Sequence, residues 1–366
     1  MNMRYFCQPH DTQPSKLFCA MQHILRLMLP VVFTVAGWSC SSESEEPDQP
    51  AGPTPQIIVL YGPGGLGDQG YNDCILAGIQ NFKKDHRDDV EIYQYSPGVI
   101  EDAERLLTDW LSLPESNVPT LFIAGSNDYE DMIGNVLTDR SLTSNKRLLL
   151  FESDNAARLP VTTFRLSMYG ASYLAGVTAA AYMNRYAQSD GGNADALILL
   201  AHRADAAIAR AGDGFRDGFN DSADDGTVFT EYLAEDWTGY VSAQIAYQRM
   251  SDWAKSYGFI FPVAGGSNQG VYRYTREHAD APLTAGMDVD QSGLTRNITG
   301  SVIKHIDKVI YNYMETWLTS GELPESAVFG LESGYTDWQL SAYHSSYQSA
   351  VDAARETAIR KEAAEL

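Results

Sequence analysis

The residues best suited to bind a small molecule lie in residues 62–72 (GPGGLGDQGYN), directly after the short apolar segment 56–61 (QIIVLY). Glycine lets a backbone approach a bound molecule closely, and the segment ends with Asp68, Tyr71 and Asn72. A carboxylate, an aromatic ring and an amide offer hydrogen-bond acceptors, a donor and a flat apolar face. This combination suits a small polar ring compound better than a bare phosphate. The carboxyl end of a predicted first strand is also where open α/β sheets bind ligands.

Three further segments place glycine or charged residues directly after an apolar run. They are residues 259–271 with Gly265 and Gly266, residues 285–291 with Asp288 and Asp290, and residues 299–307 with Lys304 and Asp307. The third segment is expected to begin a helix over residues 301–320. Each segment also has an ordinary explanation, namely a strand-to-helix turn for the glycines and a solvated helix position for Lys304. Because no EF-hand loop or histidine surrounds the aspartates, hydroxyl groups are a simpler partner for them than a metal ion.

The chain offers little support for catalysis or for a cofactor. Gly62, Gly64 and Gly67 satisfy the GxGxxG pattern of dinucleotide-binding folds, but the second predicted strand ends in residues 96–98 (SPG) instead of the acid that the pattern requires. The histidines lack metal-ligand spacing and no GxSxG motif is present. Cys74 is expected to be a small buried thiol. We therefore expect no catalytic residue, no cofactor and no metal.

The N-terminal residues have the composition of an export signal. Arg26 and an apolar stretch precede small residues and Cys40, which looks like a lipoprotein cleavage site. Residues 1–40 are expected to be the signal and lipoprotein segment with Cys40 lipidated, and a plain signal peptide is the alternative. A stretch of about 12 apolar residues is shorter than the ~20 that a membrane span needs. Residues 41–55, which lack aromatic and large aliphatic side chains, are expected to form a disordered tether.

These features predict a cell-envelope protein that is lipid-anchored to a membrane and either periplasmic or exposed at the surface. The formal net charge of −22 repels nucleic acid and anionic lipid headgroups. A nucleic-acid partner is therefore not expected.

Strand-like apolar runs alternate with amphipathic helical patterns over the remaining residues. This βαβ order predicts an α/β fold with mainly parallel sheets that helices cover on both faces. The expected strands are residues 57–61, 90–95, 120–124, 147–151, 162–165, 196–200, 228–232, 259–263, 283–287 and 328–331. The expected helices are residues 71–84, 100–112, 169–186, 211–220, 241–257 and 301–320.

Six short segments, in this order, resemble the basic membrane protein family. They are DQGYN (68–72), SYLAG (172–176), FRDGF (215–219), PVAGGSNQG (262–270), GMDVDQ (286–291) and SVIKHID (301–307). The family consists of lipoproteins similar to bacterial purine-nucleoside receptors, which are the substrate-binding components of ABC importers. The resemblance covers about residues 56–345.

The resemblance implies a type I periplasmic-binding architecture, in which two Rossmann-like lobes close by a hinge motion on a ligand in the cleft between them. Lobe 1 is expected to contain residues 56–158 and 297–325. Lobe 2 is expected to contain residues 159–296 and 326–345. Residues 346–366 are expected to form a C-terminal helix.

The resemblance also implies a ligand-binding role for eight residues. Tyr61 and Trp237 would stack on the two faces of the base, and each stacked base contributes on the order of 1–3 kcal/mol. Asp68 and Asn72 would bind the base edge. The ribose would be bound by the carboxylate of Asp288, by the ammonium of Lys304 and by the backbone near Gly265 and Gly266.

The chain departs from the family pattern at three places. Tyr129 follows Gly125 where the family has an aromatic residue closer to the glycine. Residues 200–205 (LAHRAD) carry Arg203 and Asp205 in place of a GGMD-like turn, which leaves the identity of the base open. Tyr71 replaces the usual phenylalanine and is expected to be a core aromatic residue.

The resulting expectation is a monomeric solute-binding lipoprotein that delivers a purine nucleoside or a related ligand to an ABC permease without chemical turnover. Two alternatives remain at this point. One is a nucleoside-processing or NAD-dependent enzyme on the same scaffold. The other is a sensing module that presents its ligand to a membrane receptor.

Overall fold

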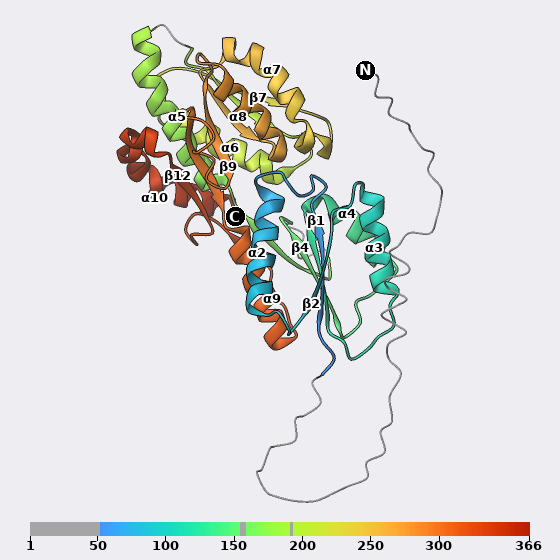
Figure 1. Cartoon of the computed structure of the whole chain (residues 1–366). Coiled ribbons are helices and arrows are strands. Elements are labelled where there is room, and N and C mark those ends of the chain that lie inside the picture. Colours follow the sequence, from blue (N-terminus) through green and yellow to red (C-terminus); the bar gives the residue numbers. More distant parts are fainter. Residues whose placement is uncertain (1–51, 154–158, 191–192) are drawn as a thin grey trace, which may run out of the picture. The chain divides into compact units, whose positions relative to one another are not determined.

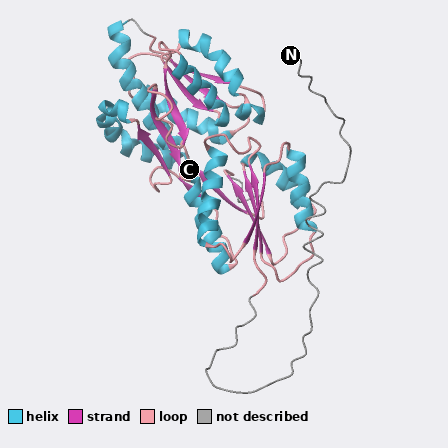
Figure 2. Ribbon diagram, in the orientation of Figure 1, coloured by secondary structure: helices cyan, strands magenta, loops and turns pink. Residues whose placement is uncertain are grey.

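The described residues of the computed structural model form two six-stranded sheets with flanking helices (Figures 1 and 2). The description covers residues 52–153, 159–190 and 193–366. The predicted signal segment, Cys40 and most of the predicted tether lie outside these residues. The α/β class with parallel-rich sheets, predicted from the alternating pattern, is confirmed.

Sheet A is entirely parallel and has the strand order β11-β5-β4-β3-β1-β2. Apolar side chains bury both faces of its central strands, as expected for a parallel sheet. Its strands are β1 (Gln56–Tyr61), β2 (Glu91–Tyr95), β3 (Thr120–Gly125), β4 (Lys146–Phe151), β5 (Thr162–Leu166) and β11 (Ala327–Phe329).

Two pairs of helices pack on opposite faces of sheet A (Figure 1). The first pair is α2 (Tyr71–Asp85) and α9 (Ile306–Ser320), and the second is α3 (Ile100–Ser112) and α4 (Glu130–Thr138). The first pair lies in one apolar cluster with Tyr61 and Phe164, and the second lies in another with Phe122 and Tyr129.

Sheet B has the strand order β12-β10-β9-β8-β6-β7, and all its pairings are parallel except that of β10 with β12. Its strands are β6 (Ala196–Leu200), β7 (Val228–Tyr232), β8 (Phe259–Val263), β9 (Leu283–Asp288), β10 (Ile298–Lys304) and β12 (Thr336–Leu340). Its helices are α5 (Tyr169–Asp190), α6 (Ala206–Asn220), α7 (Ala243–Ser256), α8 (Asn268–Glu277) and α10 (Gln348–Glu365). One apolar cluster joins sheet B to these helices.

Within the described residues the chain passes between the two sheets after β5, after β10 and after β11. The predicted lobe boundaries differ from this arrangement in three strands. Strands β5 and β11, expected in lobe 2, pair in sheet A, and β10, expected in lobe 1, pairs in sheet B. The difference arises because each crossing follows the strand, whereas the predicted boundaries place it before the strand.

The predicted helix over residues 301–320 is wrong in its first part. Residues Ile298–Lys304 form strand β10, and α9 begins only at Ile306. Every residue of β10 is buried, which suits the β-branched Ile298, Thr299, Val302 and Ile303 better than a helix does. The other predicted strands match the observed ones within two residues at each end. Helix α4 and strand β12 were not predicted.

Glycines allow α5 and α6 to pack with their backbones in contact. A methyl group on Gly218 would overlap the backbone carbonyl of Tyr173, and one on Gly176 would overlap that of Phe215. These contacts assign a structural role to two of the six family-like segments, SYLAG and FRDGF, since each supplies one of these glycines.

We expect Gly218→Ala to lower the free energy of unfolding by about 3 kcal/mol, because overpacking a close contact forces the backbone to shift. Chemical denaturation would measure the change. Gly134→Ala in α4 is the matched control, because its added methyl group would meet only the Leu159 side chain at 3.4 Å. Equal stability of both variants would show that the α5–α6 contact is less tight than described.

The C-terminal helix α10 is attached to the segments that cross between the sheets. Its Glu362 is buried and accepts hydrogen bonds from the backbone N–H of Gly170, just after β5, and of Leu331, just after β11. The predicted C-terminal helix is thus observed, and it is anchored at two crossing points.

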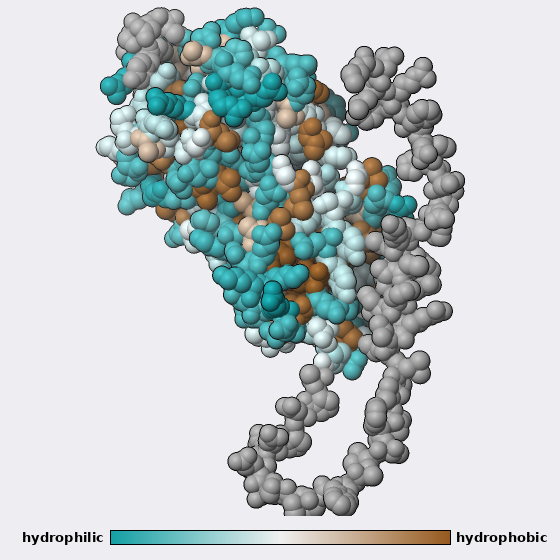
Figure 3. All heavy atoms as spheres, in the orientation of Figure 1, coloured by the Kyte–Doolittle hydropathy of each residue, from teal (hydrophilic) through white to brown (hydrophobic). Residues whose placement is uncertain are grey.

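No helix among the described residues combines the length and the apolar character needed to cross a lipid bilayer. The face drawn in Figure 3 is mostly hydrophilic and is interrupted by scattered apolar side chains.

Candidate functional site

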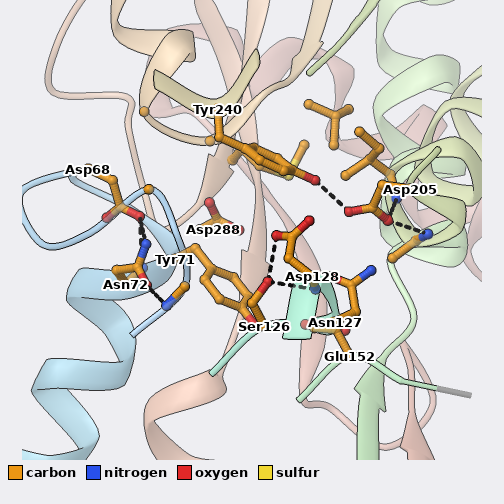
Figure 4. A pocket seen from close by; sticks show the side chains of 18 of the residues that line it. Asp68, Tyr71, Asn72, Ser126, Asn127, Asp128, Glu152, Asp205, Tyr240 and Asp288 are labelled. Atoms are coloured by element: carbon orange, nitrogen blue, oxygen red, sulfur yellow. Dashed lines mark hydrogen bonds between the residues drawn. The ribbon is translucent and has the colours of Figure 1, made fainter. Parts of the chain in front are cut away.

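One cavity is lined by the loops at the carboxyl ends of strands from both sheets, the usual ligand-binding edge of open α/β sheets (Figure 4). Sheet A contributes residues after β1, β3, β4 and β5, and sheet B contributes residues at the ends of β6, β8, β9 and β10 and from the 3₁₀ turn η2 (Trp237–Val241). The lining residues are Gly62, Pro63, Gly64, Asp68, Tyr71, Asn72, Ser126, Asn127, Asp128, Glu152, Met168, Asp205, Ala207, Ile208, Tyr240, Val263, Gly265, Gly266, Met287, Asp288 and Lys304.

Asp68 and Asn72 line the cavity, but their polar atoms bind the loop that carries them. The Asp68 carboxylate accepts from the backbone N–H of Gly70, Asn72 and Asp73 and from the Asn72 amide. The Asn72 amide oxygen accepts from Gly62 N–H at 2.8 Å. Burial raises the pKa of Asp68, and these hydrogen bonds oppose that rise. Both side chains therefore hold the glycine-rich loop in shape at the start of α2.

Asp288 ends β9 and faces the cavity with its carboxylate unpaired. It is only 6% exposed, and no described residue donates a hydrogen bond to it. Burial raises its pKa to about 6, although the nearby Lys304 ammonium opposes the rise. Its φ of 69° lies in the left-handed region, which aspartate adopts more readily than most residues. A methyl group at Gly70 would lie 2.8 Å from this carboxylate, so an alanine there would make the Asp288 carboxylate turn away.

Lys304 and Glu152 form a buried ion pair that joins the two sheets. The Lys304 Nζ lies 2.6 Å from Glu152 Oε1, and the side chains are 4% and 5% exposed. The other Glu152 oxygen accepts from Leu166 N–H. Burial disfavours the charge on Lys304, but the carboxylates of Glu152 and Asp288 outweigh this effect and raise its pKa. Sequence reasoning missed Glu152, which occupies a left-handed position with φ of 59°.

Two tyrosine rings line the cavity. Tyr71 begins α2, and the Lys304 ammonium lies 4.9 Å from the centre of its ring. The Tyr71 hydroxyl is shielded from solvent and has no hydrogen-bond partner among the described residues. Tyr240, from η2, donates its hydroxyl proton to Asp205. Figure 4 shows the two rings on opposite sides of the cavity.

Tyr61 and Trp237, the predicted stacking residues, do not line the cavity. The Tyr61 ring is 1% exposed in the apolar cluster of sheet A, and its hydroxyl donates to Gln94 Oε1 at 2.5 Å. Tyr129, the other aromatic candidate, is fully buried and donates to the Tyr61 carbonyl oxygen. The tyrosines among the described lining residues are Tyr71 and Tyr240 instead.

Two acids at one end of the cavity complete the polar lining. Asp128 accepts from the Ser126 hydroxyl at 2.7 Å. Asp205 caps α6, because one of its oxygens accepts from the N–H groups of Ala207 and Ile208. Burial and the charge of Asp205 raise the pKa of Asp128. The sequence contained one sign of these acids: both lie in segments that depart from the family pattern, Asp128 in the segment after Gly125 and Asp205 in residues 200–205.

The predicted Gly265 and Gly266 lie at the cavity, where they allow close approach of other residues. Gly265 has a φ of 53°, and a methyl group on it would lie 3.0 Å from the Tyr240 ring. A methyl group on Gly266 would lie 3.5 Å from Asp68 Cβ. Gly265 therefore allows close packing against Tyr240, whereas a methyl group on Gly266 would make only an ordinary contact with Asp68.

The cavity encloses about 90 Å³, which is small beside the roughly 300–1,000 Å³ of most ligand pockets. A ligand with a ring and a sugar would therefore require the walls to move apart. Because the walls belong to different sheets and the chain crosses between the sheets at few points, a hinge movement would widen the cavity.

The fold and the cavity define a type I periplasmic-binding architecture, and similar solved structures share it. A solute-binding protein of an ABC transporter system from Aeropyrum pernix K1 has a TM-score of 0.64 at 16% identity, and the match covers 85% of each chain. A carbohydrate transporter solute-binding protein from Agrobacterium radiobacter, solved with D-arabinose, has a TM-score of 0.57 at 15% identity over 82% of this chain and 98% of that one. A transcriptional activator of the comK gene from Bacillus halodurans has a TM-score of 0.56 at 15% identity over 83% and 98%.

The family of ABC transporter substrate-binding proteins described as PnrA-like matches residues 56–363, and the chain belongs to this family. It is therefore an extracytoplasmic solute-binding protein of the ABC transporter class rather than a member of an enzyme family, which implies a small-molecule ligand and a permease partner. No match to the sequence is found among curated proteins.

Proposed function

We propose that this solute-binding protein captures a purine nucleoside, or a closely related polar ligand, in the cavity between its two sheets and passes it unchanged to an ABC permease. The observation that carries the proposal is that four of the six family-like segments meet at one cavity. They supply Tyr71, Gly265 with Gly266, Asp288 and Lys304. Two aromatic rings, a buried unpaired carboxylate and an ammonium group match the requirements of a base and a sugar.

In this proposal the base stacks between Tyr71 and Tyr240, which lie on opposite sides of the cavity. Stacking would contribute on the order of 1–3 kcal/mol per ring. The Asp288 carboxylate accepts hydrogen bonds from the two ribose hydroxyls, which supply the donors that it lacks. Lys304, with donors left over from its bond to Glu152, donates to ribose oxygens.

Calorimetric titration of the purified chain with adenosine, guanosine, inosine and thymidine tests the proposal. We expect binding of at least one purine nucleoside and weaker binding of thymidine, which lacks the 2′-hydroxyl and has the smaller ring. Absence of heat with all four compounds, confirmed by an unchanged melting temperature, would refute a nucleoside ligand.

Nucleoside affinity is expected to fall as the pH decreases below about 6, the raised pKa of Asp288. Only the ionised carboxylate can accept from both hydroxyls, so each pH unit well below that value should weaken binding about tenfold. Titrations between pH 4.5 and 8 would measure the dependence. Asp68 and Asp128 also have raised pKa values, so Asp288→Asn is the control that should remove the part due to Asp288.

We also propose that the chain is a monomer and that lipid on Cys40 anchors it to a membrane. Mass spectrometry of the protein from membranes would detect the lipid. The Cys40→Ser variant should lose both the added mass and the membrane association. Equal membrane association of the variant would contradict the anchor.

A further inference from the structure

The charges that line the cavity are strongly unbalanced. Five carboxylates face a single basic residue among the described lining residues. That residue, Lys304, is already paired with Glu152 at 2.6 Å. The carboxylates are those of Asp68, Asp128, Glu152, Asp205 and Asp288. Among the residues that the structure describes, the other four have no cation of their own, which costs free energy in a partly buried site.

Neutral donors satisfy two of these four acids. Asp68 and Asp205 accept from backbone N–H groups and from neutral side chains. Asp128 has one neutral partner, Ser126. Two nearby basic residues are not among the described lining residues. The Arg203 guanidinium lies over the Tyr232 ring. His202, whose positive charge would lower the pKa of Asp128, packs against the Tyr240 ring.

A second observation indicates that a ligand completes the site. The Asp288 carboxylate is 94% buried, as its 6% exposure shows, and it faces the cavity without a hydrogen-bond donor from the part of the chain that the structure describes. The nearby Tyr71 hydroxyl is also shielded from solvent and has no partner in the described ranges. Figure 4 shows both side chains at the cavity together with Asp128. Buried polar groups are normally paired, so these atoms are positioned for donors that a bound molecule brings.

We infer that the ligand carries a cationic nitrogen group, such as an ammonium or an amidinium, that binds beside Asp128 and Asp205. The inference rests on the proposed function, because it concerns the ligand of the same cavity. Hydrogen bonds between such a group and a carboxylate are about twice as strong as neutral ones. An organic cation fits better than a metal ion, because the described residues contain no group of three or more histidine, cysteine or acidic side chains that could hold one.

Adenosine and two cationic analogues provide the test. In 5′-amino-5′-deoxyadenosine an ammonium group replaces the 5′-hydroxyl with little change in size, and 1-methyladenosine carries the positive charge on the base. Calorimetry near pH 7 should show that at least one analogue binds about tenfold more tightly than adenosine, the size expected of one charge-assisted bond. This preference should shrink as salt is raised to about 0.3 M, because salt screens charges.

The Asp128→Asn variant should reduce the ratio of cationic to neutral affinity. The matched control is Asp88→Asn, which removes the same charge from an exposed residue outside the cavity. Adenosine binding as tightly as both analogues would overturn the inference and leave the proposed function intact. Failure of adenosine and both analogues to bind would overturn the inference, and failure of guanosine, inosine and thymidine as well would overturn the proposed function. A preference for a cation that persists unchanged in Asp128→Asn and in Asp205→Asn would overturn the assignment to this end of the cavity.

Discussion

Replacing Asp288 with asparagine is expected to weaken purine-nucleoside binding by about 100-fold or more. The carboxylate is proposed to accept from two ribose hydroxyls, and hydrogen bonds to a charged group contribute about 1.5–3 kcal/mol each. Asparagine is the better substitution because the residue has a φ of 69°, which asparagine tolerates and alanine does not. Calorimetry on the purified variant would measure the loss.

The stability of the same variant separates lost binding from misfolding. The folded-state pKa of Asp288 is raised to about 6, so the folded protein holds this proton more tightly than the unfolded chain. Stability contributed by the protonated group is complete below the unfolded pKa and is lost as the pH rises toward about 6. Above that pH, the asparagine variant should be at least as stable as the parent. A lower melting temperature with normal affinity would remove Asp288 from the site.

The variant Lys304→Met is expected to lower the free energy of unfolding by about 3–5 kcal/mol, the typical cost of removing one partner of a buried ion pair. Glu152 would then be a buried charge without a cation, since its side chain is 5% exposed. The melting temperature should fall by on the order of 10 °C for a chain of this size. Differential scanning calorimetry of the ligand-free protein would measure it.

The double variant Lys304→Met/Glu152→Gln tests the cause. Removing the second charge should restore much of the lost stability, since a neutral pair of similar size avoids the cost of burial. A double variant that is no more stable than the single one would mean that the lysine contributes by packing alone. Arg147→Met, which removes an ion pair with the exposed Glu322, is a control for which we expect a change of at most about 1 kcal/mol.

The regular βαβ part of the fold was predictable because its strands are apolar runs of strand length, bounded by turn residues. Prediction failed where the same residues suit two structures. Residues 301–320 contain apolar side chains at helical spacing across the true boundary at His305, so the strand β10 was read as the first turns of α9. The hydrogen bonds of β10 to β9 and β12 decide the outcome, and these pairings are long-range.

The same limit explains the aromatic residues of the cavity. Strand β1 is apolar on both faces, and one step along a strand reverses the side-chain direction. The sequence therefore could not show that Tyr61 packs into the sheet while Tyr71 lies at the cavity. Trp237 and Tyr240 share one short turn. Only the backbone path of that turn decides that Tyr240, and not Trp237, lines the cavity.

One acid of the cavity, Glu152, could be identified only from a contact between residues far apart in the sequence. Glu152 is identified by its pairing with Lys304, which lies 152 positions away in the sequence. In contrast, Asp68, Asn72, Asp288 and the two glycines all line the cavity, because each belongs to a segment that follows a predicted strand; their roles in ligand binding stay a prediction. Their individual bonding was not predictable, as the loop-internal bonds of Asp68 and Asn72 show.

The attachment of Glu362 to Gly170 and Leu331 has a practical meaning for gene fusions and premature stop codons. A product that ends before this glutamate would keep every described cavity residue. It would lose the hydrogen bonds that hold two of the three segments crossing between the sheets. Such a product is expected to fail in uptake assays, because the segments that connect the two sheets would no longer be held in place. Reporter domains should therefore be attached after Leu366, so that helix α10 and Glu362 are kept.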